Sequence, residues 1–134
     1  MPQETDQTRE EYVKALINSD LTLNPVGINT ECYRIYEAMS LGSIPVIEDV
    51  MTSGNCGAKN ERTSLRLLKK YGAPVVYVKN WSELQKVLMK ERELSQVEKV
   101  RRRTDILHWY KKFKAKMQEV FLHAIQTQFF ADDR

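Results

Sequence analysis

The fold is decided by residues 19–49, which read SDLTLNPVGINTECYRIYEAMSLGSIPVIED. A short apolar run at 21–23 is followed by a proline and a glycine, which predicts a buried strand that ends there. A second buried strand is predicted at 44–47. Between the strands, apolar residues recur at the spacing of one helix face: Cys32, Ile35, Tyr36 and Met39. Gly42 stands where a left-handed residue at the end of this helix belongs. Strand, helix and strand in this order form a βαβ unit with parallel strands.

Outside this unit, helices and strands continue to alternate. A third short strand is predicted at 75–78. Ser95 and Glu98 have the spacing of a capping box, and a long amphipathic helix follows over about 95–130, with a bend or break near Thr104. We therefore expect an α/β, Rossmann-like fold with a short parallel sheet flanked by helices and a long C-terminal helix.

Length and composition suit one domain, covering residues 1–134. Hydrophobic residues make up 42% and charged residues 29% of the chain, which is ordinary for a globular domain. No apolar run approaches the roughly 18 residues that span a bilayer. The polar N-terminus is neither a signal peptide nor a transit peptide. Three strands are few for a parallel sheet buried on both faces, so we expect a fragment of a larger protein.

The formal net charge is +3, and the positive charge gathers near the C-terminus. The basic residues of this region are Lys99, Arg101, Arg102, Arg103, Lys111, Lys112, Lys114 and Lys116. Such a run is compatible with nucleic-acid binding, but no recognised nucleic-acid fold accompanies it. We therefore expect a solvated helix face and no nucleic-acid partner. Two cysteines without a C-x-x-C pair and two distant histidines predict no metal site.

The loop 25–30 is the first candidate binding element. In open α/β sheets, ligands bind beyond the carboxyl ends of the strands, which is where this loop lies. Asn29 or Thr30 can cap the following helix, whose free N–H groups and dipole favour a phosphate. Gly27 lets a backbone approach a ligand closely, and Thr30 adds a hydroxyl donor. Gly27 as a plain turn residue and Thr30 as a plain cap are the alternatives.

Two charged residues of the same helix are further candidates. Arg34 offers a forked cationic donor that suits a diphosphate. Glu37 offers a carboxylate that can accept both hydroxyls of a ribose. The alternative is a surface ion pair between the two, worth roughly a few tenths of a kcal/mol. Neither a G-x-G-x-x-G nor a P-loop motif is present, which leaves dinucleotide and P-loop sites without their main support.

Glu48 and Asp49 follow the second strand and so lie near the same edge of the sheet. They are candidates for contact with a donor sugar. Asp49 has an equally plain alternative as a cap of the next turn, because aspartate favours turns through local hydrogen bonds.

The sequence resembles the signature of exostosin-type glycosyltransferases, and most closely the ribitol xylosyltransferase family. The exostosin-type signature lies in residues 19–27, 34, 37–38 and 42–47. The closer similarity lies in residues 29–38, 43–46, 48–52, 54–57, 72–74 and 79–81. The similarity runs from about residue 6 into the last helix and is most specific at 19–57. It implies the C-terminal, donor-binding half of a GT-B enzyme with two Rossmann domains.

That family transfers xylose from UDP-xylose to ribitol phosphate in the O-mannosyl glycan of dystroglycan, as a Golgi type II membrane protein. The resemblance implies that Arg34 lies near the diphosphate and that Glu37 binds the ribose. With Gly27, Asn29 and Thr30 of the loop, these residues form the expected nucleotide site. The anchor, the stem and the acceptor-binding domain lie outside this chain, so no catalytic base is named. No cofactor is expected besides the UDP-sugar donor, and the lack of a D-x-D motif favours no metal. The alternative function is a non-catalytic α/β binding or assembly module.

A lumenal location would also favour a disulfide between Cys32 and Cys56. The βαβ unit brings both residues to the same end of the sheet, which makes a short separation possible. The alternative is that Cys32 is a buried free thiol in the apolar stripe of its helix.

Overall fold

Three short parallel strands form the centre of the chain, and the computed structural model describes residues 4–50 and 64–129. The elements are α1 (Asp6–Asn18), β1 (Leu21–Asn24), α2 (Tyr33–Ser40), β2 (Ile44–Glu48), α3 (Arg66–Lys70), β3 (Val76–Val78), the 3₁₀ turn η1 (Trp81–Glu83), α4 (Leu84–Glu93) and α5 (Gln96–Phe129). The strand order is β1-β2-β3, and β2 pairs parallel with both neighbours. The predicted α/β fold, with a short parallel sheet and a long last helix, is confirmed.

The core lies where α2 and α5 pack on the sheet. Ile44 and Ile47 of β2 are buried, because the central strand is covered on both faces as parallel strands require. They join Met39 of α2 and Ile106 and Phe113 of α5 in one apolar cluster. At the sheet edge, by contrast, Leu23 of β1 keeps 43% of its surface exposed.

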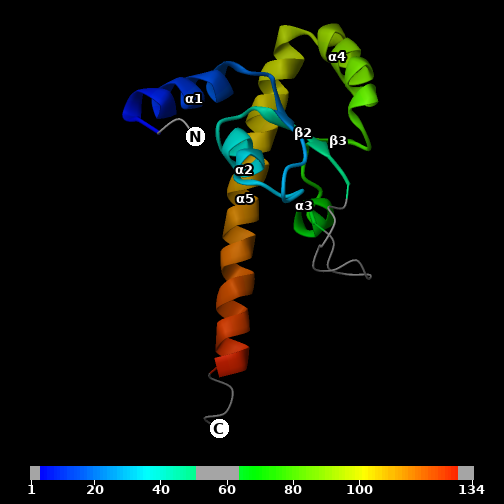
Figure 1. Ribbon diagram of the computed structural model, residues 1–134. Coiled ribbons are helices and arrows are strands. Elements are labelled where there is room, and N and C mark those ends of the chain that lie inside the picture. Colours follow the sequence, from blue (N-terminus) through cyan, green and yellow to red (C-terminus); the bar gives the residue numbers. More distant parts are fainter. Residues whose placement is uncertain (1–3, 51–63, 130–134) are drawn as a thin grey trace.

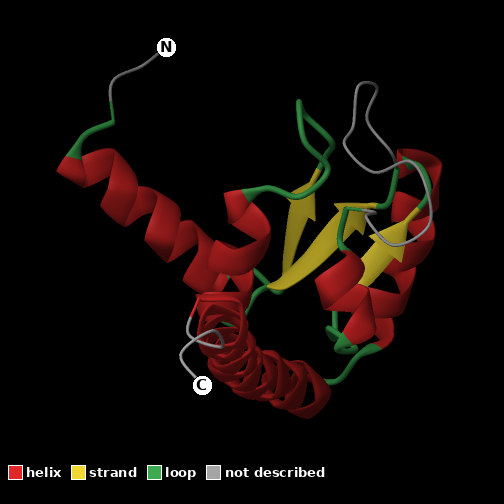
Figure 2. Cartoon of the chain, turned by 90° about the horizontal axis from the view of Figure 1, so that it is seen from below, coloured by secondary structure: helices red, strands yellow, loops and turns green. Residues whose placement is uncertain are grey.

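The two longest described helices, α1 and α5, lie differently against the rest of the fold. In Figure 1, α5 runs past α2 and extends well beyond it towards the C-terminus, while α1 projects away from the sheet. Figure 2 shows α2 between α1 and the strands, and the apolar cluster on β2 includes buried residues of α2, α3 and α5. Within the described ranges, no helix combines the length and apolar character needed to cross a membrane.

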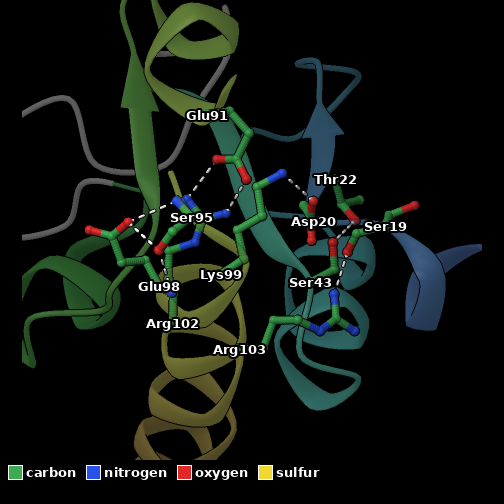
Figure 3. Close-up of polar contacts among 10 residues, drawn as sticks. All are labelled: Ser19, Asp20, Thr22, Ser43, Glu91, Ser95, Glu98, Lys99, Arg102 and Arg103. Atoms are coloured by element: carbon green, nitrogen blue, oxygen red, sulfur yellow. Dashed lines mark hydrogen bonds and ion pairs between the residues drawn. The ribbon is translucent and has the colours of Figure 1, made fainter. Parts of the chain in front are cut away.

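Basic side chains hold the first turns of α5 against the rest of the chain (Figure 3). Lys99 Nζ lies 3.1 Å from the carboxylate of Asp20. Arg102 makes a two-pronged pair with Glu91, with N–O distances of 2.7 and 2.5 Å. These contacts connect α5 to the start of β1 and to α4, so the basic run predicted to be a solvated face is in part structural.

Helix ends confirm two sequence predictions and contradict two. Gly42, which follows the C-cap of α2, has a φ of +83°, the left-handed value predicted for it. The capping box of α5 is present, with Ser95 N donating to Glu98 Oε2 over 2.8 Å. The break predicted near Thr104 is wrong, because α5 runs unbroken from Gln96 to Phe129, whereas the bend stays a prediction. The other correction concerns the start of α2.

The residue that caps α2 is Cys32, so the prediction of Asn29 or Thr30 as the cap is wrong. Thr30 is buried, and its hydroxyl donates to the carbonyl oxygen of Val50 over 2.6 Å. The side chain that could have capped the helix is therefore used to hold the loop against the segment after β2.

Candidate functional site

A hollow of about 580 Å³ opens at the carboxyl end of β1, between the following loop and the N-terminus of α2. Its walls are Pro25, Gly27, Ile28, Asn29, Glu31, Cys32, Tyr33, Arg34 and Tyr36. This is the place at which an open parallel sheet binds ligands, as the sequence predicted. Three of the five predicted nucleotide-binding residues, Gly27, Asn29 and Arg34, line it, whereas Thr30 and Glu37 do not.

The loop is tied near both of its ends to the segment that ends β2. The backbone N–H of Val26 donates to Glu48 Oε2 over 3.1 Å. Thr30 makes the second tie, through its hydroxyl to Val50. Glycine, isoleucine and asparagine at 27–29 lie between these ties and form the rim of the hollow.

Backbone N–H groups are available at this rim. Among the described residues, no hydrogen bond takes up the N–H groups of Gly27, Ile28 and Asn29. The first N–H groups of α2, at Tyr33 and Arg34, have no partner within the helix because of their position in its first turn. Donors of this kind at the positive end of a helix dipole favour an anion.

Gly27 leaves space at the rim. A Cβ atom placed there would meet nothing within 4 Å, and Gly27 is not among the residues with a left-handed backbone. The loop therefore does not need glycine for its own conformation. The open space would let a ligand approach the backbone closely, and the role of Gly27 in ligand binding stays a prediction.

Arg34 is the second residue of α2 and is exposed at the wall of the hollow. Among the described residues that line this wall, Arg34 has the one cationic side chain. No ion pair joins Arg34 to Glu37 in the described part of the chain, so the alternative of a surface pair is not realised. A forked donor beside free N–H groups is suited to a diphosphate.

Glu37 lies one turn further along α2 and faces α1. The hydroxyl of Tyr12 donates to Glu37 Oε2 over 2.6 Å. Burial and the nearby Glu37 carboxylate raise the pKa of Tyr12 to about 12, and Arg34 opposes the rise. The carboxylate is thus held by a side chain from α1 beside Arg34, outside the wall of the hollow.

A second carboxylate, which the sequence analysis missed, lines the hollow itself. Glu31 accepts a hydrogen bond from the hydroxyl of Tyr36, and burial, together with this carboxylate, raises the pKa of that hydroxyl. A carboxylate disfavours phosphate but accepts hydrogen bonds from sugar hydroxyls. Glu31 and Arg34 on one wall therefore match a ligand that carries both hydroxyl groups and negative charge. The pattern E-x-x-R at the start of the helix, from Glu31 to Arg34, was the signal available in the sequence.

Glu48 and Asp49, the candidates for donor-sugar contact, are engaged within the fold. Glu48 Oε2 accepts from Trp81 Nε1 over 2.8 Å as well as from Val26. Asp49 pairs with Lys69 Nζ at 2.7 Å, and its backbone N–H donates to Val78 over 2.8 Å. Neither residue lines the hollow, and their hydrogen bonds connect the regions at the ends of the strands.

Cys32 places its thiol 3.6 Å from Asn24 Oδ1, at the end of β1. Its predicted partner, Cys56, lies outside the described residues, so the disulfide stays a prediction. Within residues 4–50 and 64–129, no group of three or more histidine, cysteine, aspartate and glutamate side chains is arranged to hold a metal ion.

The basic residues of α5 do not form one free patch. Lys99 and Arg102 pair with carboxylates of other elements, and Arg103 donates to backbone carbonyls at the ends of α1 and α2. Three of the eight basic residues that suggested nucleic-acid binding are therefore engaged in contacts within the fold.

Comparison with known proteins gives the family of the chain. The family described as RXYLT1 C-terminal domain matches residues 1–130. The chain is 51% identical to ribitol-5-phosphate xylosyltransferase 1 of Mus musculus, 50% to that of Homo sapiens and 51% to that of Danio rerio, over 97–99% of its own length. It spans 30% of the length of each of these relatives. No solved structure matches it at a significant level. The chain belongs to the RXYLT1 C-terminal domain family.

Proposed function

We propose that this chain is the donor-binding part of a xylosyltransferase, and that its ligand is UDP-xylose. The observation that carries the proposal is the hollow at the end of β1, where free backbone N–H groups, a helix N-terminus and Arg34 meet. The names of the relatives support xylosyl transfer to ribitol 5-phosphate as the reaction of the whole protein.

The diphosphate of the donor lies across the rim at 27–29, and the uridine ribose lies towards α2. As the bond between xylose and UDP breaks, negative charge grows on the leaving diphosphate. The N–H groups of the loop, the dipole of α2 and Arg34 stabilise this charge, and such electrostatic stabilisation is commonly the largest single contribution to a catalysed rate. Glu31 or Glu37 accepts hydrogen bonds from the hydroxyls of the sugar or the ribose.

Other parts of the reaction belong to the longer protein. We assign the acceptor, ribitol phosphate in the O-mannosyl glycan of dystroglycan, to a part outside this chain, together with the catalytic base. We also propose that the longer protein is held in the Golgi by a membrane anchor outside this chain. The donor site uses no cofactor and no metal ion. Titration of the chain with UDP, with and without a divalent cation, tests the second point.

The test is a chimaera in which this chain replaces the matching 30% of the mouse relative. We expect transfer of xylose from UDP-xylose to a ribitol-phosphate acceptor, and its loss in the chimaera that carries Arg34→Ala. Arg101→Ala, which removes an exposed arginine of α5, is the matched control and retains activity. Equal transfer by the Arg34→Ala and Arg101→Ala chimaeras would contradict the proposal.

A further inference from the structure

One oxygen atom connects the regions that follow all three strands. Glu48 Oε2, at the end of β2, accepts from the N–H of Val26 after β1 over 3.1 Å. The same oxygen accepts from the indole Nε1 of Trp81 over 2.8 Å, and Trp81 opens the 3₁₀ turn η1 after β3. Trp81 thus reaches the loop of the hollow through a single carboxylate, although it does not line the hollow.

The geometry makes the indole a determinant of where the carboxylate points. A carboxylate on a flexible side chain has several rotamers, and each hydrogen bond to it favours one of them. Glu48 is half-buried, so a carboxylate without a donor there would turn towards solvent. The Trp81 N–H therefore favours the orientation in which Glu48 also binds Val26.

The Val26 bond in turn determines the shape of the loop. The tie through Val26 and the tie from Thr30 to Val50 bracket the three residues at 27–29. Loss of the first tie leaves the loop attached at one end only, and its N–H groups then sample several directions. A preorganised set of donors binds an anion more tightly than a mobile set, because less order is lost on binding.

We propose that Trp81 is a positioning residue of the nucleotide loop: its indole N–H orients Glu48, which holds Val26 and keeps residues 27–29 in the shape that receives a nucleoside diphosphate. The ligand in this statement rests on the proposed function, whereas the hold of Trp81 on the loop does not. Trp81 belongs to the segment 79–81 that the sequence analysis singled out and to which it gave no role.

The chain offers a matched control, since it has two tryptophans. Trp109, on α5, also donates its indole N–H, to the carbonyl oxygen of Tyr71 over 2.9 Å. Its ring stacks on Phe113 with a centroid distance of 4.9 Å, in the core. Trp81→Phe and Trp109→Phe therefore remove the same chemical group, one beside the loop and one away from it.

The first measurement is amide hydrogen exchange of the ligand-free chain. We expect Trp81→Phe to speed exchange at Val26 by roughly threefold to tenfold, the equivalent of one hydrogen bond. Glu48→Ala must speed exchange at the same amide, which keeps the test decisive if Trp81→Phe does not fold. Trp109→Phe must lower the melting temperature and leave exchange at Val26 near its wild-type rate. An unchanged Val26 rate in Trp81→Phe or in Glu48→Ala would overturn the proposal.

The second measurement is UDP affinity by calorimetry. We expect Trp81→Phe to weaken UDP binding roughly threefold to tenfold and to have no further effect in a Glu48→Ala background, because it acts through Glu48. Full additivity of the two changes would overturn the proposal, since Trp81 would then act independently of Glu48. If the wild-type chain did not bind UDP at all, the proposed function would fail, and exchange at Val26 would still decide the role of Trp81.

Discussion

The hydroxyl of Tyr12, on α1, donates to the carboxylate of Glu37, on α2, over a distance of 2.6 Å between residues 25 positions apart in the chain. The bond orients a carboxylate that the family resemblance associates with the ribose. It also places α1, which otherwise projects from the fold, in direct contact with the helix that bounds the hollow (Figure 1). The role of Glu37 can therefore be tested separately from the diphosphate.

We expect Glu37→Gln to weaken uridine and UDP by the same factor, because a ribose contact is common to both ligands. The loss of a charge-assisted hydrogen bond corresponds to about 1.5–3 kcal/mol. Calorimetric titration with each ligand gives the two factors. A loss confined to UDP would show that Glu37 acts through the phosphates instead.

Arg34→Ala, unlike Glu37→Gln, should weaken the binding of UDP and not that of uridine. It removes the cationic donor at the wall of the hollow, so UDP binding should weaken by about 1.5–3 kcal/mol, or roughly 10- to 150-fold, while uridine binding stays unchanged. Arg101→Ala is the control for net charge. The assignment fails if the two arginine variants bind UDP equally well.

A third prediction concerns the attachment of α5. Arg103 donates to the carbonyl oxygens of Ser19 over 2.7 Å and Leu41 over 3.3 Å, and also to that of Ile17. We expect Arg103→Met to lower the free energy of unfolding by about 2–3 kcal/mol, because partly buried carbonyls lose a charged donor. Urea denaturation measures the change.

Arg101→Met is the matched control for that variant, since Arg101 lies on the exposed side of the same turn of α5. Its effect should stay within about 0.5 kcal/mol. Equal destabilisation by the two substitutions would mean that the carbonyl contacts of Arg103 add nothing to the stability of the fold.

Tyr77 gives a prediction about alkaline pH. Burial, with a smaller contribution from Asp49, raises the pKa of Tyr77 to about 12. An unfolded tyrosine has a pKa of about 10. Between these values the folded chain keeps a proton that the unfolded chain loses, so stability falls as the pH rises from about 10 to about 12.

Tyr77→Phe removes this contribution, and the alkaline loss of stability should become smaller. The raised pKa values of Tyr12 and Tyr36 leave part of the loss in place. At neutral pH the variant should be at least as stable, because the Tyr77 hydroxyl is buried with no hydrogen-bond partner among the described residues. Urea denaturation at about pH 9 and about pH 11 tests this, and an undiminished alkaline loss would refute it.

The strands and the position of the hollow could be predicted because each depends on a local pattern. The apolar run at 21–23 was followed by Pro25 and Gly27, and the run at 44–47 was preceded by Gly42. The structure extends each run by one residue, to Asn24 and Glu48. Parallel pairing followed from the strand–helix–strand order, and Gly42 marked the end of α2. None of these inferences required knowledge of contacts between distant residues.

The start of α2 could not be predicted, because a distant partner decides it. Thr30 has the chemistry of a helix cap, yet its hydroxyl bonds to Val50, 20 residues away. Glu48 was likewise read as a candidate for a sugar contact, and its use by Val26 and Trp81 depends on the packing of three strand ends. Local propensity does not report on such bonds.

The basic residues of α5 show the same limit. Their spacing along the chain indicated a solvated face, whereas Lys99, Arg102 and Arg103 bind partners on other elements (Figure 3). In the candidate site, Arg34 was recognisable from its place near a helix N-terminus. Glu31 was missed although its spacing to Arg34 was visible in the sequence, because its place in the hollow follows from the fold of the loop.

The most direct test of the account is calorimetric titration of the 134-residue chain with UDP, with and without a divalent cation. We predict a saturable heat of binding at one site, with the same affinity in both conditions. Arg34→Ala should weaken the affinity for UDP at least tenfold, because it removes one charge-assisted hydrogen bond. Arg101→Ala leaves it unchanged. The absence of any saturable heat with the folded wild-type chain, or binding that Arg34→Ala does not weaken, would contradict the claim that the hollow at the end of β1 is a nucleotide site.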